Sequence, residues 1–433
     1  MIGDDIANTD RPPSSEGRSL LIREATPMDP FDLYRMLSVR TKSRILLVVM
    51  DGLGGHPFPG RGISELEAAR IPNLDRLASE SICGLSTPIA PGITPGSGPS
   101  HLALFGYDPF RYNVGRGVLS ALGIDFDLRG GDVAARANFC TVDNGVITDR
   151  RAGRISTEES ARRCEILSSI ELPGAELFIQ PEMDYRAAFI LRGEGLSGDL
   201  TDSDPQATGE PPRDVEARAA SGPKAEAARR TAGLVNAFLR QAAVRLASHP
   251  PGNMILLRGF DEHADFPRIQ DVFKLTPACI AAYPMYRGLS KLCGMEVLET
   301  GMRLEDELNT LKAHWDRHDF FFFHIKKTDS CGEDGDFDGK VAVLEEVDAL
   351  LPKLRDLGPD VLAVTGDHST PCLLAAHSWH PVPLLIWSPR CQPDEVTSFH
   401  ERALARGGLA AIRHVDIMPL LMANALKFIK YGA

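Results

Sequence analysis

The stretch Val364-Thr-Gly-Asp-His-Ser-Thr-Pro371 decides the fold, because it joins the end of an apolar strand to two side chains of kinds that bind metal ions. We call residues of these kinds, aspartate, glutamate and histidine, metal-type residues. The apolar residues 361–364 predict a buried strand, and the chain then turns at Gly366. Asp367 and His368 offer one oxygen and one nitrogen to a divalent metal at the mouth of an α/β sheet, where such sites usually lie.

A second strand near the start of the chain has the same kind of ending. Residues 45–50 are apolar, Asp51 follows them, and residues 52–55 read Gly-Leu-Gly-Gly. Two distant strands that each deliver a metal-type ligand at a strand end predict a metalloenzyme.

The composition indicates the class of protein and its surroundings. The chain has 433 residues, of which 43% are hydrophobic, so we expect a folded protein of two or three domains. A formal charge of −12 argues against binding to nucleic acid or to an anionic membrane. The eight cysteines are scattered, no secretory signal opens the chain, and no apolar run reaches the roughly 18 residues of a membrane span. We therefore expect reduced thiols and a cytoplasmic location.

Strands and helices alternate in the first and last parts of the chain. This alternation predicts an α/β fold in which helices cover both faces of a mostly parallel sheet. The expected strands are 45–50, 320–325, 361–365 and 383–387, and the expected helices are 339–357, 416–428 and a capped helix within 64–78 that follows a proline break. The polar, proline- and glycine-rich composition of residues 1–18 predicts a loose tail, and the spacing of apolar residues within 19–43 predicts a short amphipathic helix. We therefore treat 1–43 as an N-terminal extension.

The middle of the chain has a different pattern. It contains strand candidates at 134–142, 185–192 and 254–257, a polar loop at 196–223 and a helix at 224–246. The metal-type residues lie before and after this stretch. We therefore predict a discontinuous metal-binding catalytic domain of residues 44–124 and 286–433, with a smaller α+β substrate-binding domain, 125–285, inserted between its halves.

The segment Thr94-Pro-Gly-Ser-Gly-Pro-Ser-His101 offers a candidate nucleophile. Glycine and proline around Ser97 hold the backbone in a tight turn and keep bulk away from the hydroxyl, which a nucleophilic serine requires. Taken alone, the segment favours an ordinary Pro-Gly-Ser turn. Ser100 and Thr94 are alternative nucleophiles by residue type.

Further metal-type residues follow the apolar strand 320–325. Asp329 and Glu333 are four apart, so a helical turn would point both carboxylates the same way toward one cation. The alternatives are a solvated acidic loop or a calcium site, although the full calcium-loop pattern is absent. His377 and His380 lie just beyond the Asp-His pair, and such a concentration of histidine and aspartate favours a metal site.

Arginines beside glycines are the fourth constellation. Guanidinium groups bind phosphate and carboxylate with two parallel hydrogen bonds, so a cluster of them in an acidic protein indicates an anionic substrate. A surface ion pair is the alternative for any single arginine. The candidates are Arg116, Arg150, Arg151, Arg154, Arg186, Arg192 and Arg258.

Together these segments resemble the cofactor-independent phosphoglycerate mutases of the archaeal type, within the alkaline phosphatase superfamily. The resemblance runs from about residue 44 to the end of the chain. The matching segments are Met50-Asp-Gly-Leu-Gly54, 71–78, Pro95-Gly-Ser97, 101–109, Gly115-Arg-Gly117, 149–154, 191–197, 326–340, Gly366-Asp-His368 and Lys430-Tyr-Gly-Ala433.

The resemblance implies a reaction and a set of site residues. It implies that Ser97 takes the phosphoryl group of 3-phosphoglycerate as phosphoserine and returns it to the 2-hydroxyl of the retained glycerate. It implies two divalent metal ions, manganese or else magnesium, cobalt or zinc. One would lie on Asp51, Ser97, Asp367 and His368, and the other on Asp329, His377 and Glu333. Asp149 and the arginines above would bind substrate, and Lys326 would add positive charge near the phosphoryl group, with a solvent-facing lysine as the alternative.

The chain departs from the family pattern at two places. Glu333 stands where many relatives have histidine, which makes a preference for zinc less expected, and Gly98-Pro99 stand where many have an acidic and a small residue. A related phosphotransferase or a phosphomonoesterase on another small phosphorylated substrate is the alternative function, and a non-catalytic binding protein is a third. The sequence leaves the oligomeric state open.

Overall fold

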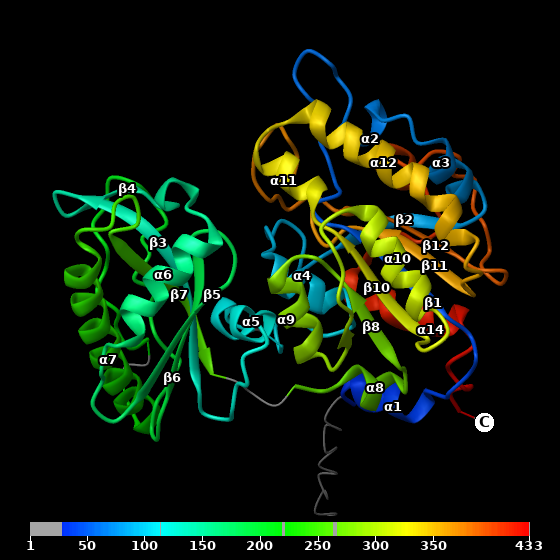
Figure 1. Cartoon of the computed structure of the whole chain (residues 1–433). Coiled ribbons are helices and arrows are strands. Elements are labelled where there is room, and N and C mark those ends of the chain that lie inside the picture. The colour runs from blue at the N-terminus through cyan, green and yellow to red at the C-terminus, as the bar shows by residue number, and fades with distance from the viewer. Residues whose placement is uncertain (1–27, 113, 219–220, 263–265, 433) are drawn as a thin grey trace, which may run out of the picture.

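The computed structural model describes residues 28–112, 114–218, 221–262 and 266–432, which form two bodies, each built on its own sheet (Figure 1). The predicted tail at residues 1–18 lies outside the described residues. The short amphipathic helix expected within 19–43 is α1 (Pro30–Leu37). None of the helices in the described ranges combines the length and apolar character that a membrane span requires.

The larger body contains an eight-stranded sheet. Its strand order is β13-β2-β12-β11-β1-β10-β8-β9, and among the described strands of this sheet only β12 runs against the others. The strands are β1 (Ile45–Met50), β2 (Ile82–Thr87), β8 (Pro277–Ile280), β9 (Glu296–Val297), β10 (Phe320–Ile325), β11 (Val361–Thr365), β12 (Val382–Trp387) and β13 (Ala410–Arg413). The predicted mostly parallel sheet is confirmed.

Helices cover both faces of this sheet, which explains why its central strands β1, β10, β11 and β12 are apolar at nearly every position. In β1, Leu46, Val48 and Met50 pack into one core cluster and the alternate residues into another. The first face carries α2 (Glu65–Ala68), α3 (Pro72–Ser79), α10 (Leu304–His314), α12 (Phe337–Arg355) and α13 (Glu401–Leu404). The second carries α1, α4 (Ser97–Leu104), α8 (Ile269–Phe273), α9 (Pro284–Leu292) and α14 (Ile417–Asn424).

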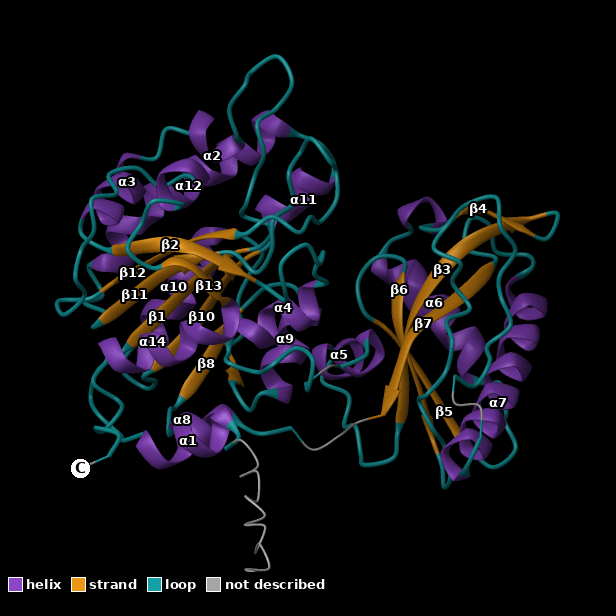
Figure 2. Cartoon of the chain, turned by 180° about the vertical axis from the view of Figure 1, so that it is seen from behind, coloured by secondary structure: helices purple, strands orange, loops and turns teal. Residues whose placement is uncertain are grey.

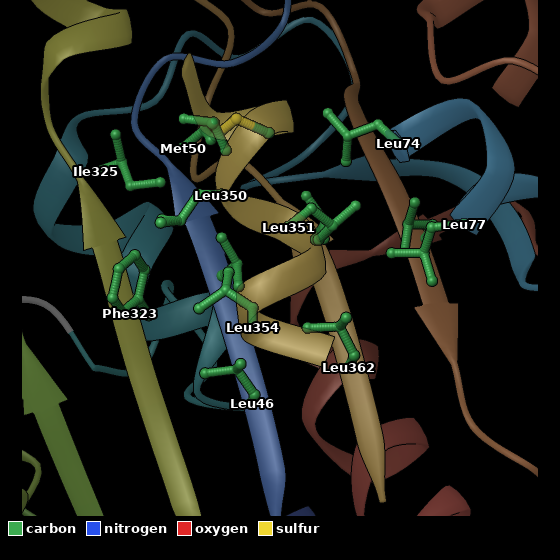
Figure 3. Close-up of a cluster of buried hydrophobic side chains, with 14 of the residues drawn as sticks. Leu46, Met50, Leu74, Leu77, Phe323, Ile325, Leu350, Leu351, Leu354 and Leu362 are labelled. Carbon is green, nitrogen blue, oxygen red and sulfur yellow. The ribbon is translucent and has the colours of Figure 1, made fainter. Parts of the chain in front are cut away.

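Figure 3 shows the first core, in which Leu350, Leu351 and Leu354 of α12 lie over Leu46 of β1 and Leu362 of β11. Each of these five side chains is at most 5% exposed. Burial of leucine side chains stabilises a fold by roughly 1.5–3 kcal/mol each, so α12 is a major source of the stability of the strands that lead to the site.

Two predicted helices are shorter or divided in the structure. The helix within 64–78 is divided into α2 and α3, because Pro72 occupies the first turn of α3 and cannot continue a preceding helix. Ser64 begins α2 with a reciprocal capping box to Glu67. The helix predicted at 416–428 is α14, which ends at Asn424 after a short 3-10 turn at His414–Asp416.

The smaller body contains a five-stranded antiparallel sheet. Its strands are β3 (Val133–Asp143), β4 (Val146–Asp149), β5 (Glu176–Pro181), β6 (Arg186–Arg192) and β7 (Met254–Glu262). Helices α6 (Thr157–Ser168) and α7 (Pro223–Leu246) pack on one face. Helix α5 (Arg116–Gly123) packs on the other face and lies between the two bodies in both views (Figures 1 and 2).

The chain returns to the large sheet earlier than the predicted boundary at residues 285 and 286. Strand β8 pairs with β10, and α8 packs in the second core of the large body. The sequence shows no clear change of composition around residue 270, so it did not locate this boundary. The two bodies are in close contact where α9 packs against α5, because Gly288 of α9 has no side chain. A Cβ at Gly288 would lie 2.1 Å from the carbonyl oxygen of Leu119 in α5.

A buried lysine joins two loops at the carboxyl edge of the large sheet. Lys340 of α12 is fully buried, and its Nζ donates to the carbonyl oxygens of Gly52 (2.9 Å), Gly54 (3.2 Å) and Thr370 (2.9 Å). The first two carbonyls follow β1 and the third follows β11. One ammonium group therefore holds together the loops after two neighbouring strands.

We predict that Lys340→Met lowers the free energy of unfolding by about 2–3 kcal/mol, because buried carbonyls lose their donor while the volume is kept. Denaturant unfolding measures this change. The matched control is Lys353→Met on the same helix, where the lysine is half exposed and pairs with Glu305; a shift below about 0.5 kcal/mol is expected there. Equal shifts for the two variants would contradict a special role of Lys340.

Candidate active site

Three adjacent parallel strands, β10, β1 and β11, deliver polar side chains to one edge of the large sheet. Asp51 follows β1, and Asp367 and His368 follow β11. Asp329 lies in α11 (Lys327–Glu333), a short helix that begins directly after β10. Since carboxyl ends of parallel strands meet at one edge, residues from distant parts of the sequence converge there.

The first group of ligand-type atoms comes from Asp51, Asp367 and His368, all of which are fully buried and offer atoms within 4.8 Å of one another. The Nε2 atom of His368 lies 3.4 Å from Asp51 Oδ1 and 3.2 Å from Asp367 Oδ2. Ser97, the first residue of α4, brings its Oγ within 3.3 Å of the same nitrogen. The predicted nucleophile therefore lies beside this group.

The second group consists of Asp329, His368 and His377. The Nε2 atom of His377 is 3.7 Å from Asp329 Oδ1, and the two imidazole rings stack with centroids 3.7 Å apart. His377 Nδ1 lies 3.0 Å from the carbonyl oxygen of Pro95, which fixes the ring and leaves Nε2 directed at the carboxylate.

The donor set fits divalent metal ions. Thr370 Oγ1 donates to Asp329 Oδ1 (2.6 Å) and lies 3.1 Å from His368 Nδ1, so a proton on Nδ1 leaves the Nε2 lone pair free. Asp51 Oδ1 is buried and has no hydrogen-bond partner among the described residues, which is costly for a carboxylate unless a cation takes it. Aspartate oxygens and imidazole nitrogens are ligands of manganese, magnesium and zinc.

Lys326 supplies positive charge at the same place. Its Nζ lies 2.9 Å from Asp51 Oδ2 and 2.5 Å from Asp329 Oδ2, so it is not the solvent-facing lysine of the alternative interpretation. Burial alone would lower the pKa of Lys326, but Asp51 and its neighbours raise it well above the usual value. Conversely, burial opposes the ionisation of Asp51, yet Lys326 and the nearby histidines hold its pKa well below the usual value.

Glu333 is less closely engaged than the other predicted ligands. It ends α11 one turn after Asp329, as the helical spacing predicted. Its side chain is 53% exposed, and its nearest carboxylate oxygen is 3.9 Å from His377 Nε2. It lies outside both groups of converging atoms, whereas His380 lies against His56 instead of the site.

The alternative nucleophiles have other environments. Ser100 is fully buried, and its Oγ lies within hydrogen-bond distance of the carbonyl oxygens of Gly96 and Ser97 and of the Asp367 carboxylate, to one of which it can donate. Thr94 is exposed in the loop before α4. Of the three hydroxyls, only that of Ser97 both lies against the metal-type groups and opens onto a cleft.

That cleft, of about 530 Å³, lies between the metal-type groups and the smaller sheet. A β-bulge in β7 shapes one wall: Gly259, at φ +65°, lets the first turn of α5 approach and brings Arg258 beside Arg116. The predicted substrate residues that line the cleft are Arg116, Arg150, Arg151, Arg154, Arg186 and Arg258.

Two predicted substrate residues do not line the cleft. Arg192 follows Arg186 by six residues on β6, roughly 20 Å along the strand, and pairs with Asp132 at 2.7 Å. The carboxylate of Asp149 accepts hydrogen bonds from the backbone of Arg151 (2.8 Å) and Gly153 (2.5 Å). It therefore shapes the turn that presents the arginines instead of facing the substrate.

Several residues of the site were missed from the sequence. Arg136 and Asn138 of β3 line the cleft. Their signal was the alternation of polar and small residues in Val133-Ala-Ala-Arg-Ala-Asn138. His101 contacts Asp367 at 3.1 Å; burial alone would lower the pKa of His101, but Asp367 raises it. Tyr286 of α9 donates to Asp51 and carried no sequence signal.

Known proteins share this chain's sequence and architecture. A family model described as 2,3-bisphosphoglycerate-independent phosphoglycerate mutase matches residues 78–251. The solved PH0037 protein from Pyrococcus horikoshii has a TM-score of 0.77 and 27% identity, covering 91% of this chain and 100% of that one. The cofactor-independent phosphoglycerate mutase from Thermoplasma acidophilum has a TM-score of 0.65 and 32% identity, covering 88% and 100%.

A curated relative in Thermus thermophilus, named a probable 2,3-bisphosphoglycerate-independent phosphoglycerate mutase, is 54% identical over 412 residues, which cover 94% of this chain and 100% of the relative. The chain therefore belongs to the family of the 2,3-bisphosphoglycerate-independent phosphoglycerate mutases.

Proposed function

We propose that this chain is a phosphoglycerate mutase, which interconverts 3-phosphoglycerate and 2-phosphoglycerate through a phosphoserine on Ser97. The supporting observation is the position of the Ser97 hydroxyl, 3.3 Å from His368 Nε2 and at the mouth of a cleft lined by arginines. The names of the relatives support the same substrate and reaction class, an intramolecular phosphoryl transfer.

We propose two divalent metal ions, with manganese favoured by the oxygen-rich donor set. Asp51, Asp367, His368 and Ser97 would hold one ion, and Asp329 and His377 the other, with Glu333 as a further candidate ligand. When bound, the ions would lower the pKa of the Ser97 hydroxyl and offset charge on the transferring phosphoryl group.

The proposed reaction has two matched transfers. In the first, Ser97 Oγ forms a bond to phosphorus while the bond from phosphorus to the substrate's 3-oxygen breaks. The serine loses its proton and the departing oxygen gains one. In the second, the 2-hydroxyl oxygen of the retained glycerate takes the phosphoryl group, and Ser97 recovers its proton. The ammonium group of Lys326, fixed between Asp51 and Asp329, adds positive charge beside this centre.

Retention of glycerate is the task we propose for the smaller body and its arginines. Arg150 and Arg258 share the buried Asp204, while Arg151 and Arg154 form no ion pair with a carboxylate of the described residues and are exposed to the cleft. The guanidinium groups of Arg151 and Arg154 are therefore free to bind the phosphate and carboxylate of the substrate. In this sense we propose that the insert is the substrate-binding domain.

We also propose a cytoplasmic enzyme of glycolysis and gluconeogenesis. All eight cysteines are free thiols, and six of them are buried, which suits a reducing compartment.

A phosphomonoesterase on the same site is the alternative, and one assay separates the two functions. The protein is incubated with Mn²⁺ and 3-phosphoglycerate, and the products are followed by ³¹P NMR. We expect 2-phosphoglycerate to form, because the arginine-lined cleft favours retention over release. Inorganic phosphate as the main product would instead establish the hydrolase.

We predict that Ser97→Ala lowers the mutase rate by at least roughly 10⁴-fold, because the nucleophile is lost. Labelling with ³²P-phosphoglycerate and acid quench followed by peptide mapping should place the phosphate on Ser97. Ser100→Ala is the comparison: it should still be labelled at Ser97. Label on Ser100 in the native protein would show that the nucleophile was assigned to the wrong hydroxyl.

We predict that chelation abolishes activity and that Mn²⁺ restores it. Metal analysis after loading should give about two ions per chain in the native protein and about one in Asp329→Asn, which loses a buried ligand. Glu333→Gln should retain two ions, because its carboxylate is half exposed and 3.9 Å from His377 Nε2. One ion in Glu333→Gln would assign that residue to the second metal site.

We predict that Arg258→Met raises the KM for 3-phosphoglycerate by about 10- to 100-fold, since a charged hydrogen-bond donor leaves the cleft. Arg192→Met is the matched control outside the cleft. It should lower stability, because the buried Asp132 loses its partner, but leave the KM unchanged. Steady-state kinetics on both variants make the test, and equal KM changes would contradict the assignment.

A further inference from the structure

Part of one face of the smaller sheet is polar although it is largely shielded from solvent. Along β3, Val133, Ala135 and Ala137 pack toward α6 and α7, so the alternate residues Arg136 and Asn138 project to the opposite face. On neighbouring strands, Arg258 of β7 stands opposite Arg136, and Arg186 of β6 stands opposite Asn138. We call these four residues, all of which line the cleft beside Ser97, the cleft face.

Three buried atoms of the cleft face have no hydrogen-bond partner among the described residues. They are the donors Arg136 Nε and Arg258 Nε and the acceptor Asn138 Oδ1. Arg136 is 4% exposed and Asn138 is 6% exposed. A buried polar atom left unpaired costs about 1–3 kcal/mol, so these atoms need partners, which a ligand in the cleft would supply.

The orphaned acceptor is unusual in this cleft because its surroundings are mostly donors. An anionic ligand supplies acceptors for the guanidinium groups, but it offers nothing to Asn138 Oδ1 unless it also carries a donor. A phosphoglycerate meets both needs: it has a phosphate, a carboxylate and one unesterified hydroxyl.

Other acceptors that line the cleft are engaged or exposed. Asp329 accepts from Lys326 and Thr370. Asp184 is 53% exposed and lies 3.9 Å from Arg186, and Asp334 is exposed. Asn138 is neutral, so its Oδ1 can accept a hydrogen bond from a hydroxyl of the ligand without repelling the ligand's phosphate and carboxylate.

We propose that Asn138 is a specificity-determining residue that binds the unesterified hydroxyl of the substrate, an inference that rests on the proposed function. Asn138 Oδ1 accepts from the 2-hydroxyl of 3-phosphoglycerate or the 3-hydroxyl of 2-phosphoglycerate. While the phosphoryl group is on Ser97, glycerate carries both hydroxyls, and Asn138 holds one while the other faces the phosphoserine.

The test compares two ligands that differ by that hydroxyl. Binding is measured by isothermal titration calorimetry to the Ser97→Ala protein with Mn²⁺, which does not turn over. The ligands are 3-phosphoglycerate and 3-phosphonooxypropanoate, which lacks the 2-hydroxyl. We expect 3-phosphoglycerate to bind roughly 10- to 100-fold more tightly, because the analogue leaves Asn138 unpaired.

Two substitutions at Asn138 separate hydrogen bonding from shape. In Ser97→Ala with Asn138→Leu, which keeps the volume but has no acceptor, both ligands should bind with equal affinity. In Ser97→Ala with Asn138→Asp, which keeps an acceptor oxygen, the preference for 3-phosphoglycerate should remain. Asn253→Ala is the matched control, because its amide holds the backbone of Val142 outside the cleft; it should keep the preference. Thermal unfolding checks that each variant is folded.

A turnover measurement gives an independent readout. In the protein that retains Ser97, Asn138→Leu should raise the ratio of released phosphate to 2-phosphoglycerate by at least about 10-fold, because glycerate is held less firmly. Unchanged ligand preference in Asn138→Leu, or equal weakening of both ligands, would overturn the role of Asn138 alone. If neither ligand binds to the folded Ser97→Ala protein and the native protein forms no 2-phosphoglycerate, the proposed function fails and this inference fails with it.

Discussion

The structure depends on the convergence of three buried carboxylates at one edge of the large sheet. Asp51, Asp329 and Asp367 come from segments far apart in the chain, and each is at most 1% exposed. Negative charges that lie close together in a low-dielectric interior repel one another strongly. This edge of the sheet is therefore stable only if cations balance the three carboxylates. Lys326 supplies one positive charge by direct contact, and the Asp51 oxygen that lacks a partner among the described residues indicates that more are needed.

The same constraint explains the organisation around that edge. Lys340 places a second ammonium group under the loops after β1 and β11, where it donates to three carbonyl oxygens. Thr370 and Pro95 orient the two histidines through Nδ1. The apolar strands and α12 make a rigid base for these loops, so the ligand atoms are held in place before any cation arrives.

The sequence predicted the four central strands of the large sheet, β12, β11, β1 and β10, because their signals were local, whereas the less apolar or shorter strands β2, β8, β9 and β13 were not predicted. Continuous apolar strands that end on Asp51 or Asp367 indicated both the strand and its functional end, and glycines around Ser97 indicated an accessible hydroxyl. The cleft residues of the smaller sheet were harder to find, because Arg136 and Asn138 are isolated polar residues among mostly apolar neighbours in the first half of β3. Arg192 was grouped with Arg186 by residue type, although strand geometry separates them by roughly 20 Å. Tertiary contacts such as Tyr286 to Asp51 leave no mark in a single sequence.

The candidate groups for phosphoryl transfer and for substrate binding lie on different bodies, and this arrangement suits a mutase better than a hydrolase. The large sheet holds the groups that would stabilise a phosphoryl group on Ser97, and the smaller body holds the arginines that would bind glycerate. A hydrolase needs only the first set, and it gains from quick release of the dephosphorylated product. A mutase must keep the dephosphorylated product, glycerate, bound while glycerate reorients, so that its other hydroxyl reaches the phosphoserine before water does. If these arginines bind glycerate as proposed, their position on a separate body would let glycerate stay bound while the covalent bond to phosphorus is broken and remade, which is the requirement that distinguishes the two reactions.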